Sequence, residues 1–531
     1  MSKFAARRRA PAAAVSTTGR TTTFGGGAAF TRDAKSDLFL FAAVNMVGED
    51  TFYEQAGGRD QRFRDLVHAA TRQDPDWVAG FVPYLRGEMN MRSAALVVAA
   101  ESALARRAGT GTGTEPTVPV RRLIAGALLR ADEPAEFLAY WKARTGRTTL
   151  PGGVQRGVAD AVARLYTERA ALKYDGVASA WRMADVVALA KPHPSGPWQA
   201  DLFDYLADRR WKRDTVRVTD RLPVLTAYRA ATAMQDAERR EHFLADPRRL
   251  GEAGMTWEQL SSLGPMDARA WSAIVPHMGL MALTRNLRNL DEAGVPDSVA
   301  EQVAARLADP EQVRRSRQFP YRFLSAYRTA PSLRWGHALE QALLASTACI
   351  PALPGRTLVL VDTSGSMQGP VSARSSVRHV DVGALFAVAL AARGCDVDLA
   401  GFANGVFGHR LRRGGSVLRQ ADEFCARVGE VGHGTETVAA LKAAYKGHDR
   451  VVIFSDMQAF AYPGGGAAGR SVSEAVPATV PLFGVNTNGY ARSSIDTARP
   501  YRYEIGGFSD KLFTMVDLLS RGRDAGWPWE G

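Results

Sequence analysis

Oxygen-bearing side chains recur in three short segments of the C-terminal third of the chain. Asp362, Ser364 and Ser366 stand in Asp-Thr-Ser-Gly-Ser, directly after the apolar run TLVLV. Thr435 lies in the Gly-flanked segment GHGTETVAAL, and Asp456 follows the apolar run VVIFS. Few carboxylates combined with hydroxyls suit Mg²⁺ or Mn²⁺, whose octahedron water or a partner's carboxylate can complete. These five residues are therefore the predicted metal ligands.

A second interpretation of the first segment needs no metal. An aspartate followed by serines can form a capped turn in which the side chains bond backbone amides. That alternative explains the segment around Asp362 alone. It does not explain why Thr435 and Asp456 follow in loops of the same kind.

Strands and helices alternate around these donors. The apolar or β-branched runs TLVLV, DVDLAGFA, RVVIFSD and VPLFGVNTN are separated by helical stretches such as DVGALFAVALAARG and ETVAALKAAYKG. This alternation predicts a doubly wound α/β domain with a mostly parallel sheet, over residues 346–531. In such domains ligands bind at the carboxyl ends of the strands, which is where the three donor segments fall.

The order of these segments resembles the metal-ion-dependent adhesion site of the von Willebrand factor A family, over roughly residues 355–531. The resemblance implies a site that binds acidic groups on partner proteins and performs no chemistry. The sequence shows no Ser-His-Asp order, no P-loop and no HExxH motif that would indicate catalysis.

The longer first part of the chain has a helical pattern. Apolar residues recur three and four positions apart in stretches such as MRSAALVVAAESALARR and VQRGVADAVARLYTERAAL, with breaks at Gly and Pro clusters. The pattern predicts an all-α domain of stacked helical pairs over residues 35–345. Residues 1–34, rich in Ala, Arg, Thr and Gly without periodicity, are predicted to be a flexible basic arm that is dispensable for folding.

Positive charge is concentrated in this helical part. The chain carries a net charge of +12, but residues 341–531 hold 19 Lys and Arg against 17 Asp and Glu. Arginine doublets recur along the helices at positions 106–107, 121–122, 209–210, 239–240 and 314–315. Guanidinium groups pair with phosphates and stack on bases, which suits RNA. Ordinary solvated helix faces give a similar pattern, so charge alone leaves both interpretations open.

Several short segments, in order, resemble the TROVE module of the Ro ribonucleoprotein family. They are Thr51-Phe52-Tyr53, Leu150-Pro151-Gly152-Gly153, Lys173-Tyr174, WRMADVVALAKPHP, Met255-Thr256-Trp257-Glu258 and MALTRNLRNL around Arg285. The resemblance implies a ring of HEAT-like helical repeats closed by the A-type domain. It also implies binding of small noncoding, Y-like RNA on the outer surface and of single-stranded 3′ ends of misfolded RNA through the ring.

The predicted RNA-binding residues are Lys173, Lys191, Arg121, Arg122 and Arg285. Lys173 matches a basic position that the family uses for small-RNA contact. The chain departs from the family pattern nearby, because Val177 replaces a basic residue and Lys191 a histidine.

The favoured function is a non-catalytic RNA-binding scaffold, with a ribonuclease or another protein as a possible partner at the metal site. A metal-dependent protein-interaction adaptor is the alternative, and a nuclease lacks the carboxylate cluster for two metals. Three widely spaced cysteines without CxxC spacing, and no long apolar run, favour a cytoplasmic protein without membrane association.

Overall fold

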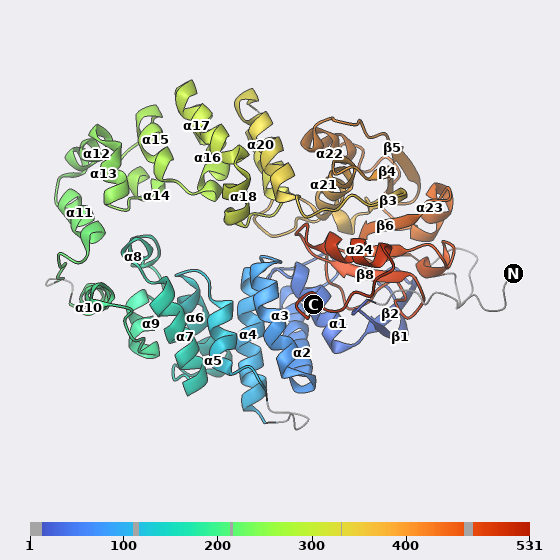
Figure 1. Cartoon of the computed structure of the whole chain (residues 1–531), viewed down its shortest axis with the longest axis horizontal. Helices are drawn as coiled ribbons and strands as arrows, with labels where there is room; N and C mark the ends of the chain where they lie inside the picture. Colours follow the sequence, from blue (N-terminus) through green and yellow to red (C-terminus); the bar gives the residue numbers. More distant parts are fainter. Residues whose placement is uncertain (1–12, 110–115, 213–215, 331, 461–470, 531) are drawn as a thin grey trace.

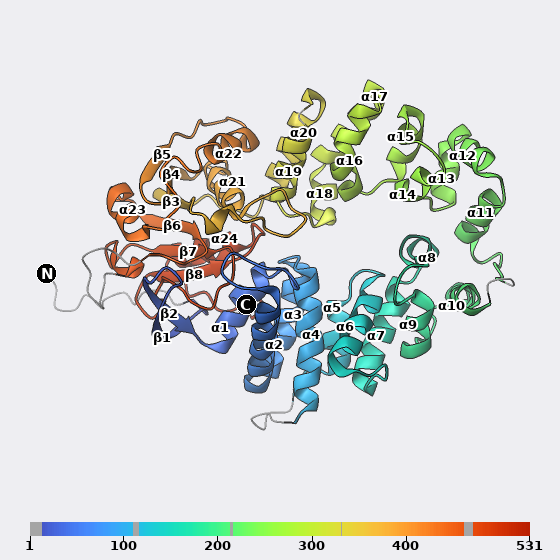
Figure 2. The same cartoon turned by 180° about the vertical axis from the view of Figure 1, so that it is seen from behind.

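The computed structural model describes residues 13–109, 116–212, 216–330, 332–460 and 471–530. It has a helical part and an α/β part, and the helices follow a curved path that returns to the α/β part, so the ribbon forms an elliptical ring (Figures 1 and 2). The predicted architecture, a helical ring with a doubly wound α/β domain, is confirmed. No helix among the described residues is both long enough and apolar enough to cross a membrane.

Twenty α-helices and one 3₁₀ turn make up the described helical part. They are α1 (Ala34–Val44), α2 (Ala56–Gln73), α3 (Pro75–Gly87), α4 (Arg92–Arg107), α5 (Val120–Ala127), α6 (Glu133–Thr145), α7 (Gly152–Leu165), α8 (Glu168–Tyr174), α9 (Met183–Ala190), α10 (Pro197–Trp211), α11 (Pro223–Thr232), α12 (Asp236–Ala245), α13 (Pro247–Glu252), α14 (Trp257–Ser261), α15 (Ala268–Ile274), η2 (Val275–His277), α16 (Leu280–Glu292), α17 (Asp297–Ala308), α18 (Pro310–Ser316), α19 (Tyr321–Thr329) and α20 (Leu333–Ser346).

Local sequence explains where these helices begin and end. Asp74 caps α3 by accepting a hydrogen bond from the Trp77 amide at 3.0 Å, and Pro75 occupies the first helical position. The helical stretch from Val154 divides into α7 and α8, because Thr167 caps a new helix through the Ala170 amide at 3.2 Å. The ring therefore consists of short helices that turn frequently.

The α/β part has a six-stranded sheet in the order β5-β4-β3-β6-β7-β8. Its strands are β3 (Arg356–Asp362), β4 (Asp396–Phe402), β5 (Val406–His409), β6 (Arg450–Ser455), β7 (Leu482–Asn486) and β8 (Arg502–Gly506), and β5 alone pairs antiparallel. The helices are α21 (His379–Ala392), α22 (Val417–Cys425), α23 (Thr437–Ala444) and α24 (Leu512–Ser520), with 3₁₀ turns at Ser366–Gln368 and Val472–Glu474.

Helices cover both faces of this sheet. Along β3, Val359 and Val361 pack in the large core that contains α21, whereas Leu358 and Leu360 pack with the α23 side. Alternate residues of one strand thus face opposite apolar layers, as expected of a parallel strand buried on both sides. Cys395 and Cys425 are free and buried in this domain.

The N-terminal segment corrects one prediction. Residues 17–22 and 28–32 form an antiparallel hairpin of β1 (Thr17–Thr22) and β2 (Ala28–Arg32), and Phe30 also pairs with Ser493 of the α/β part. Val15, Phe30 and Arg32 are buried. The prediction of a flexible arm is therefore wrong for residues 13–34, and residues 1–12 lie outside the described part. The hairpin is held by partners far away in sequence, which local periodicity does not reveal.

The segment around Trp529, which follows the α/β part, packs against the first helices of the ring. Trp529 stacks among rings of α1 and α3, at 5.1 Å from Phe81 and 6.0 Å from Phe39 between ring centroids. Gly80 of α3 permits this approach, because a Cβ there would lie 2.3 Å from the indole. The N-terminal hairpin thus packs on the α/β part, while residues near the C-terminus pack on the first helices of the ring.

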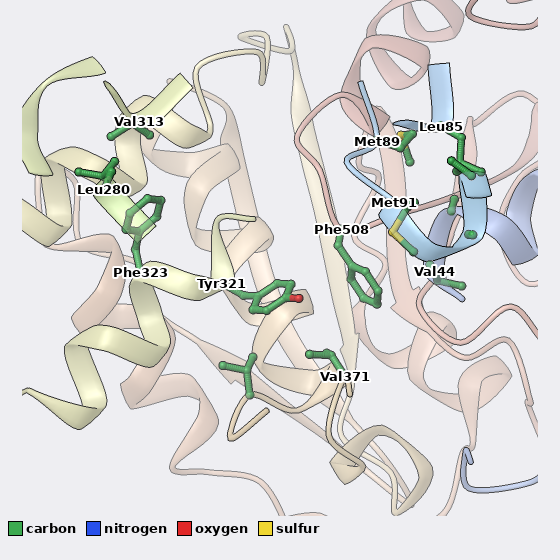
Figure 3. Close-up of a cluster of buried hydrophobic side chains, with 14 of the residues drawn as sticks. Val44, Leu85, Met89, Met91, Leu280, Val313, Tyr321, Phe323, Val371 and Phe508 are labelled. Atoms are coloured by element: carbon green, nitrogen blue, oxygen red, sulfur yellow. The ribbon is translucent and has the colours of Figure 1, made fainter. Parts of the chain in front are cut away.

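A second junction joins the last helices of the ring to the α/β part. Tyr321 of α19 points toward Phe508, which follows β8, with the ring centroids 5.9 Å apart (Figure 3). Arg328 of the same helix pairs with Asp381 at 3.1 Å and with Asp422 at 2.6 Å. The α/β part is therefore held between the beginning and the end of the helical part.

Candidate metal centre

Two neighbouring strands supply the carboxylates of the candidate site. Asp362 is the last residue of β3, and Asp456 directly follows β6, its parallel neighbour. The hydroxyl of Ser455 donates a hydrogen bond to Asp362 Oδ2 at 2.7 Å. The sheet therefore brings both aspartates to the same carboxyl edge, as the sequence predicted.

The loop after β3 places the two serines beside these carboxylates. The backbone amide of Ser364 donates to Asp362 Oδ1 at 2.9 Å, and the hydroxyls of Ser364 and Ser366 lie 3.3 Å apart. The Gly365 amide donates to the carbonyl of His433 at 3.0 Å, which ties this loop to the segment containing Thr435. The capped turn and the oxygen cluster are thus present together.

Asn404 positions the loop that contains Thr435, and no sequence pattern predicted this role. Its Oδ1 accepts hydrogen bonds from the amides of His433 at 3.0 Å and Gly434 at 2.9 Å. A Cβ at Gly434 would lie 2.5 Å from the Asn404 side chain, and Gly432 adopts a φ of +84°. The glycines flanking Thr435 are therefore required by this close approach, and Asn404 follows a strand without any motif to mark it.

The candidate site is buried, and its two carboxylates lie close enough to repel each other. Asp362, Ser364, Ser366, Thr435 and Asp456 are each no more than 3% exposed. Burial raises the pKa of Asp362 to about 6, although hydrogen bonds from Ser455 and Ser364 lower it. Burial, followed by repulsion from Asp362, raises the pKa of Asp456 to about 7. Two buried carboxylates therefore oppose each other's ionisation.

One donor atom has no partner in the described structure. Asp456 Oδ1 accepts the Gln458 amide at 3.1 Å, whereas the buried Oδ2 accepts no hydrogen bond. No group of three or more His, Cys, Asp or Glu that could hold a metal occurs among the described residues. A metal here would instead use two carboxylates and three hydroxyls, a donor set that fits Mg²⁺ or Mn²⁺.

Tyr53 also reaches this site from the helical part. Burial, followed by the negative charges of Asp456 and Asp362, raises the pKa of its phenol. The residue belongs to the loop between α1 and α2. No signal in the sequence placed it near the metal site, because the contact joins two domains.

The predicted RNA-binding residues lie on several elements of the ring. Lys173 lies in the last turn of α8, with its ammonium 5.2 Å from the Tyr174 ring centroid, and Lys191 is the C-cap of α9 with left-handed backbone. Arg285 is exposed on α16, across the ring (Figure 1). Arg121 and Arg122 are both exposed on α5, but Arg121 forms a bidentate pair with Asp160 at 2.6 and 2.8 Å. The structure does not gather these five cations at one place.

Most of the arginine doublets have internal partners. Arg106 donates to the carbonyls of Val118 and Pro75. Arg209 and Arg210 pair with Asp175 and Asp185, Arg239 and Arg240 with Asp236 and Asp267, and Arg314 and Arg315 with Glu311. The number of arginine doublets therefore overstates how many cations are available to a ligand. Lys173, Lys191, Arg122 and Arg285 have no carboxylate partner among the described residues.

Comparisons with known proteins agree with this arrangement. A family model described as the TROVE domain matches residues 245–343. The crystal structure of the RO (RSR) protein of Deinococcus radiodurans matches with a TM-score of 0.60 at 20% identity, covering 92% of this chain and 100% of that chain. Telomerase protein component 1 of Mus musculus and of Rattus norvegicus is 39% identical over 74 residues, or 14% of this chain. The chain spans about 3% of the length of these curated relatives.

These matches confirm the predicted resemblance to the Ro family. The TROVE match includes the segments around Trp257 and Arg285, two of those on which the resemblance was based. The other segments that resemble the TROVE module lie before residue 245, outside the matched range. The similarity of fold to the RO (RSR) protein extends over both the helical ring and the α/β part.

Proposed function

We propose that this protein is a non-catalytic RNA-binding scaffold of the Ro type, which binds small noncoding, Y-like RNA and single-stranded 3′ ends of misfolded RNA. The observation that carries the proposal is the match of nearly the whole chain to the fold of a Ro protein, together with the TROVE match. The excess of positive charge over the helical part is consistent with a polyanionic ligand.

The four predicted cations that lack a carboxylate partner are the proposed phosphate contacts. Lys173, Lys191, Arg122 and Arg285 are exposed and can pair with phosphates without first losing a salt bridge. Trp198 and Trp211 of α10 are 37% and 56% exposed and offer rings on which unpaired bases can stack. Arg121 would have to break its pair with Asp160 first.

Filter binding with a blunt duplex, a duplex with a single-stranded tail and a structured small RNA at two salt concentrations tests this proposal. We expect the tailed and structured RNAs to bind best, with log affinity falling by about 0.7 per phosphate contact for each unit of log salt. Binding that is undetectable, or independent of salt, would contradict RNA binding. It would leave the adaptor function as the better explanation.

Adjacent arginines provide a matched comparison in the same assay. Arg122→Gln is expected to weaken RNA binding and reduce the salt slope by about one contact. Arg121→Gln removes a charge already neutralised by Asp160 and is expected to change affinity less. Equal effects of both substitutions would show that the ion pair does not decide which arginine binds RNA.

We also propose that Asp362, Ser364, Ser366, Thr435 and Asp456 bind Mg²⁺ or Mn²⁺. The metal would supply a positive charge that holds an acidic group of a protein partner, such as a ribonuclease. The buried Asp456 oxygen without a hydrogen bond and the mutual repulsion of the two carboxylates support a cation between them. This site also supports the alternative function of a protein-interaction adaptor. Nucleic acid copurified with the protein, detected as excess absorbance at about 260 nm, favours the RNA scaffold.

A further inference from the structure

The carboxyl edge of the sheet is covered by residues from outside the α/β part. In open α/β sheets this edge is the crevice where ligands enter. Here the oxygen donors of the candidate site are almost fully buried. Two segments between residues 22 and 54 lie beside the loop that follows Asp456.

The turn of the N-terminal hairpin is the first covering segment. Thr23 donates a hydrogen bond to the carbonyl of Ala459 at 2.6 Å, and the Phe24 amide donates to the Gln458 side chain at 3.1 Å. Gly27 lies so close to Ala459 that a Cβ would stand 2.3 Å from its carbonyl oxygen. The turn is therefore fixed directly beside the loop that follows Asp456.

The loop between α1 and α2 is the second covering segment. Tyr53 stacks on Phe24 with the ring centroids 4.8 Å apart and the planes within 7°, and it lies 5.4 Å from the buried ring of Tyr490. Beyond the effect of burial, its phenol lies close enough to Asp456 and Asp362 for their negative charges to raise its pKa. Phe52 is next to it, 62% exposed, and contacts Tyr53 edge-on at 4.8 Å. Tyr53 thus packs between Phe24 and Tyr490, and Phe24 is itself bound to the loop that follows Asp456.

We infer that Tyr53 is an additional residue of the metal site, a cover supplied by the helical part that limits access of water and acidic ligands to the bound ion. The inference rests on the proposed metal site. An acidic group of a partner then reaches the ion only when the loop between α1 and α2 withdraws. Because this loop joins the first two helices of the ring, ligand binding at the metal site and the position of these helices are coupled.

Water-proton relaxation by bound Mn²⁺ tests the cover directly, without any assay of function. Each exchanging water on the ion contributes to the relaxation, and sites of this type usually keep several waters. We expect Tyr53→Ala to raise the relaxivity per bound Mn²⁺ at least about twofold over wild type. Acetate, as a small carboxylate probe, should reverse this increase in Tyr53→Ala at lower concentrations than it affects wild type.

Two control variants separate the cover from general loosening of the loop. Phe52→Ala removes the neighbouring exposed ring but leaves Tyr53 in place, so its relaxivity should equal that of wild type. Tyr53→Phe keeps the ring on Phe24 and should also stay close to wild type. A Tyr53→Phe value as high as that of Tyr53→Ala would overturn a cover made by the stacked ring.

Mn²⁺ binding and relaxivity together distinguish the absence of a cover from the absence of a metal site. Mn²⁺ bound by wild type with the same relaxivity in Tyr53→Ala would overturn the cover and leave the metal site intact. Mn²⁺ bound equally by wild type and Asp362→Ala would overturn the metal site, and the inference with it. Circular dichroism of each variant confirms that the helical ring remains folded.

Discussion

Two buried aspartates determine the chemistry of the candidate metal centre at the level of single residues. Asp362 is the more constrained of the pair, because Ser364 and Ser455 both donate hydrogen bonds to it. Asp456 retains an oxygen without a partner. We propose that a divalent cation needs both carboxylates here, because one carboxylate with neutral hydroxyls offsets less of the cost of dehydrating the ion.

Asp362→Ala is therefore expected to abolish Mg²⁺ and Mn²⁺ binding measured by titration calorimetry. Asp396→Ala is the matched control, since Asp396 is an exposed aspartate at the opposite end of β4 in the same domain. We expect the control to bind metal like wild type. Metal binding by Asp362→Ala with unchanged affinity would disprove the assignment of the site.

The raised pKa values predict how metal binding depends on pH. Burial raises the pKa of Asp362 to about 6, and burial with repulsion from Asp362 raises the pKa of Asp456 to about 7, against 3.8 for an ordinary aspartate. The metal-free folded state thus retains protons that the unfolded chain releases, and its stability falls as the pH rises from about 4 to 7. A divalent ion binds the ionised pair, so Mg²⁺ should raise the Tm more at about pH 8 than at about pH 5.5.

Thermal melts in Mg²⁺ and in EDTA at the two pH values measure this difference. The Asp362→Ala variant serves as the control, because it should show no Mg²⁺-dependent gain at either pH. Equal gains for wild type at both values would contradict proton competition at the carboxylate pair.

The five candidate ligands could be proposed from the sequence because each lies in a short local pattern. Asp362, Ser364 and Ser366 share one loop, and the other two follow a glycine or end a strand. Asn404 and Tyr53 could not be predicted. Their roles depend on contacts across the sheet edge and between domains, which no spacing along the chain encodes.

At the level of elements, the N-terminal hairpin depends on a buried ionic network. The Arg32 guanidinium pairs with Asp37 at 3.0 Å and bonds the Tyr490 carbonyl, and its bidentate contact with Glu504 includes a 2.8 Å bond. The side chains of Arg32 and Glu504 are both 0% exposed. Removal of either partner leaves an uncompensated charge in the interior.

Arg32→Ala is expected to lower the free energy of unfolding by about 3–5 kcal/mol, because Glu504 and Asp37 lose their cation. Urea denaturation followed by circular dichroism measures this loss. Arg20→Ala, at an exposed position of the same hairpin, should change the value by less than about 0.5 kcal/mol. A similarly small effect of Arg32→Ala would show that the hairpin contributes little to stability.

This hairpin also shows why the prediction of a flexible arm was wrong for residues 13–34. Its Thr, Gly and Ala residues carry no apolar period, so composition indicated a flexible arm. The structure orders it through partners such as Thr497, 480 positions further along the chain from Thr17. By contrast, helices such as α7, with Val154, Val158 and Val162 on its buried face, follow directly from the spacing of apolar residues.

The whole molecule is held together at two junctions, one at each end of the helical part. The hairpin and α1 meet the α/β part at one junction, and α19 and α20 meet it at the other. The fold classes of both parts could be predicted from periodicity. The closure into a ring could be inferred only from the family resemblance, since no single segment specifies it.

Trp529→Ala tests whether the first junction stabilises the entire molecule. We expect a loss of at least about 2 kcal/mol and a lower Tm, because the indole fills the space that Gly80 leaves between Phe39 and Phe81. Trp211→Ala, at a largely exposed tryptophan of α10, is the control and should change the Tm little. A Trp529→Ala Tm equal to that of wild type would show that this junction is not required for stability.

The reciprocal packing of the two terminal segments has a consequence for synthesis on the ribosome. The helices α1 and α3 are made first, yet Phe39 and Phe81 complete their packing only against Trp527 and Trp529. Until those tryptophans emerge, the nascent helices present an unfilled apolar face, the kind of surface that recruits chaperones. We therefore expect the ring to close after translation of the α/β part, with the first helices waiting longest for their partners.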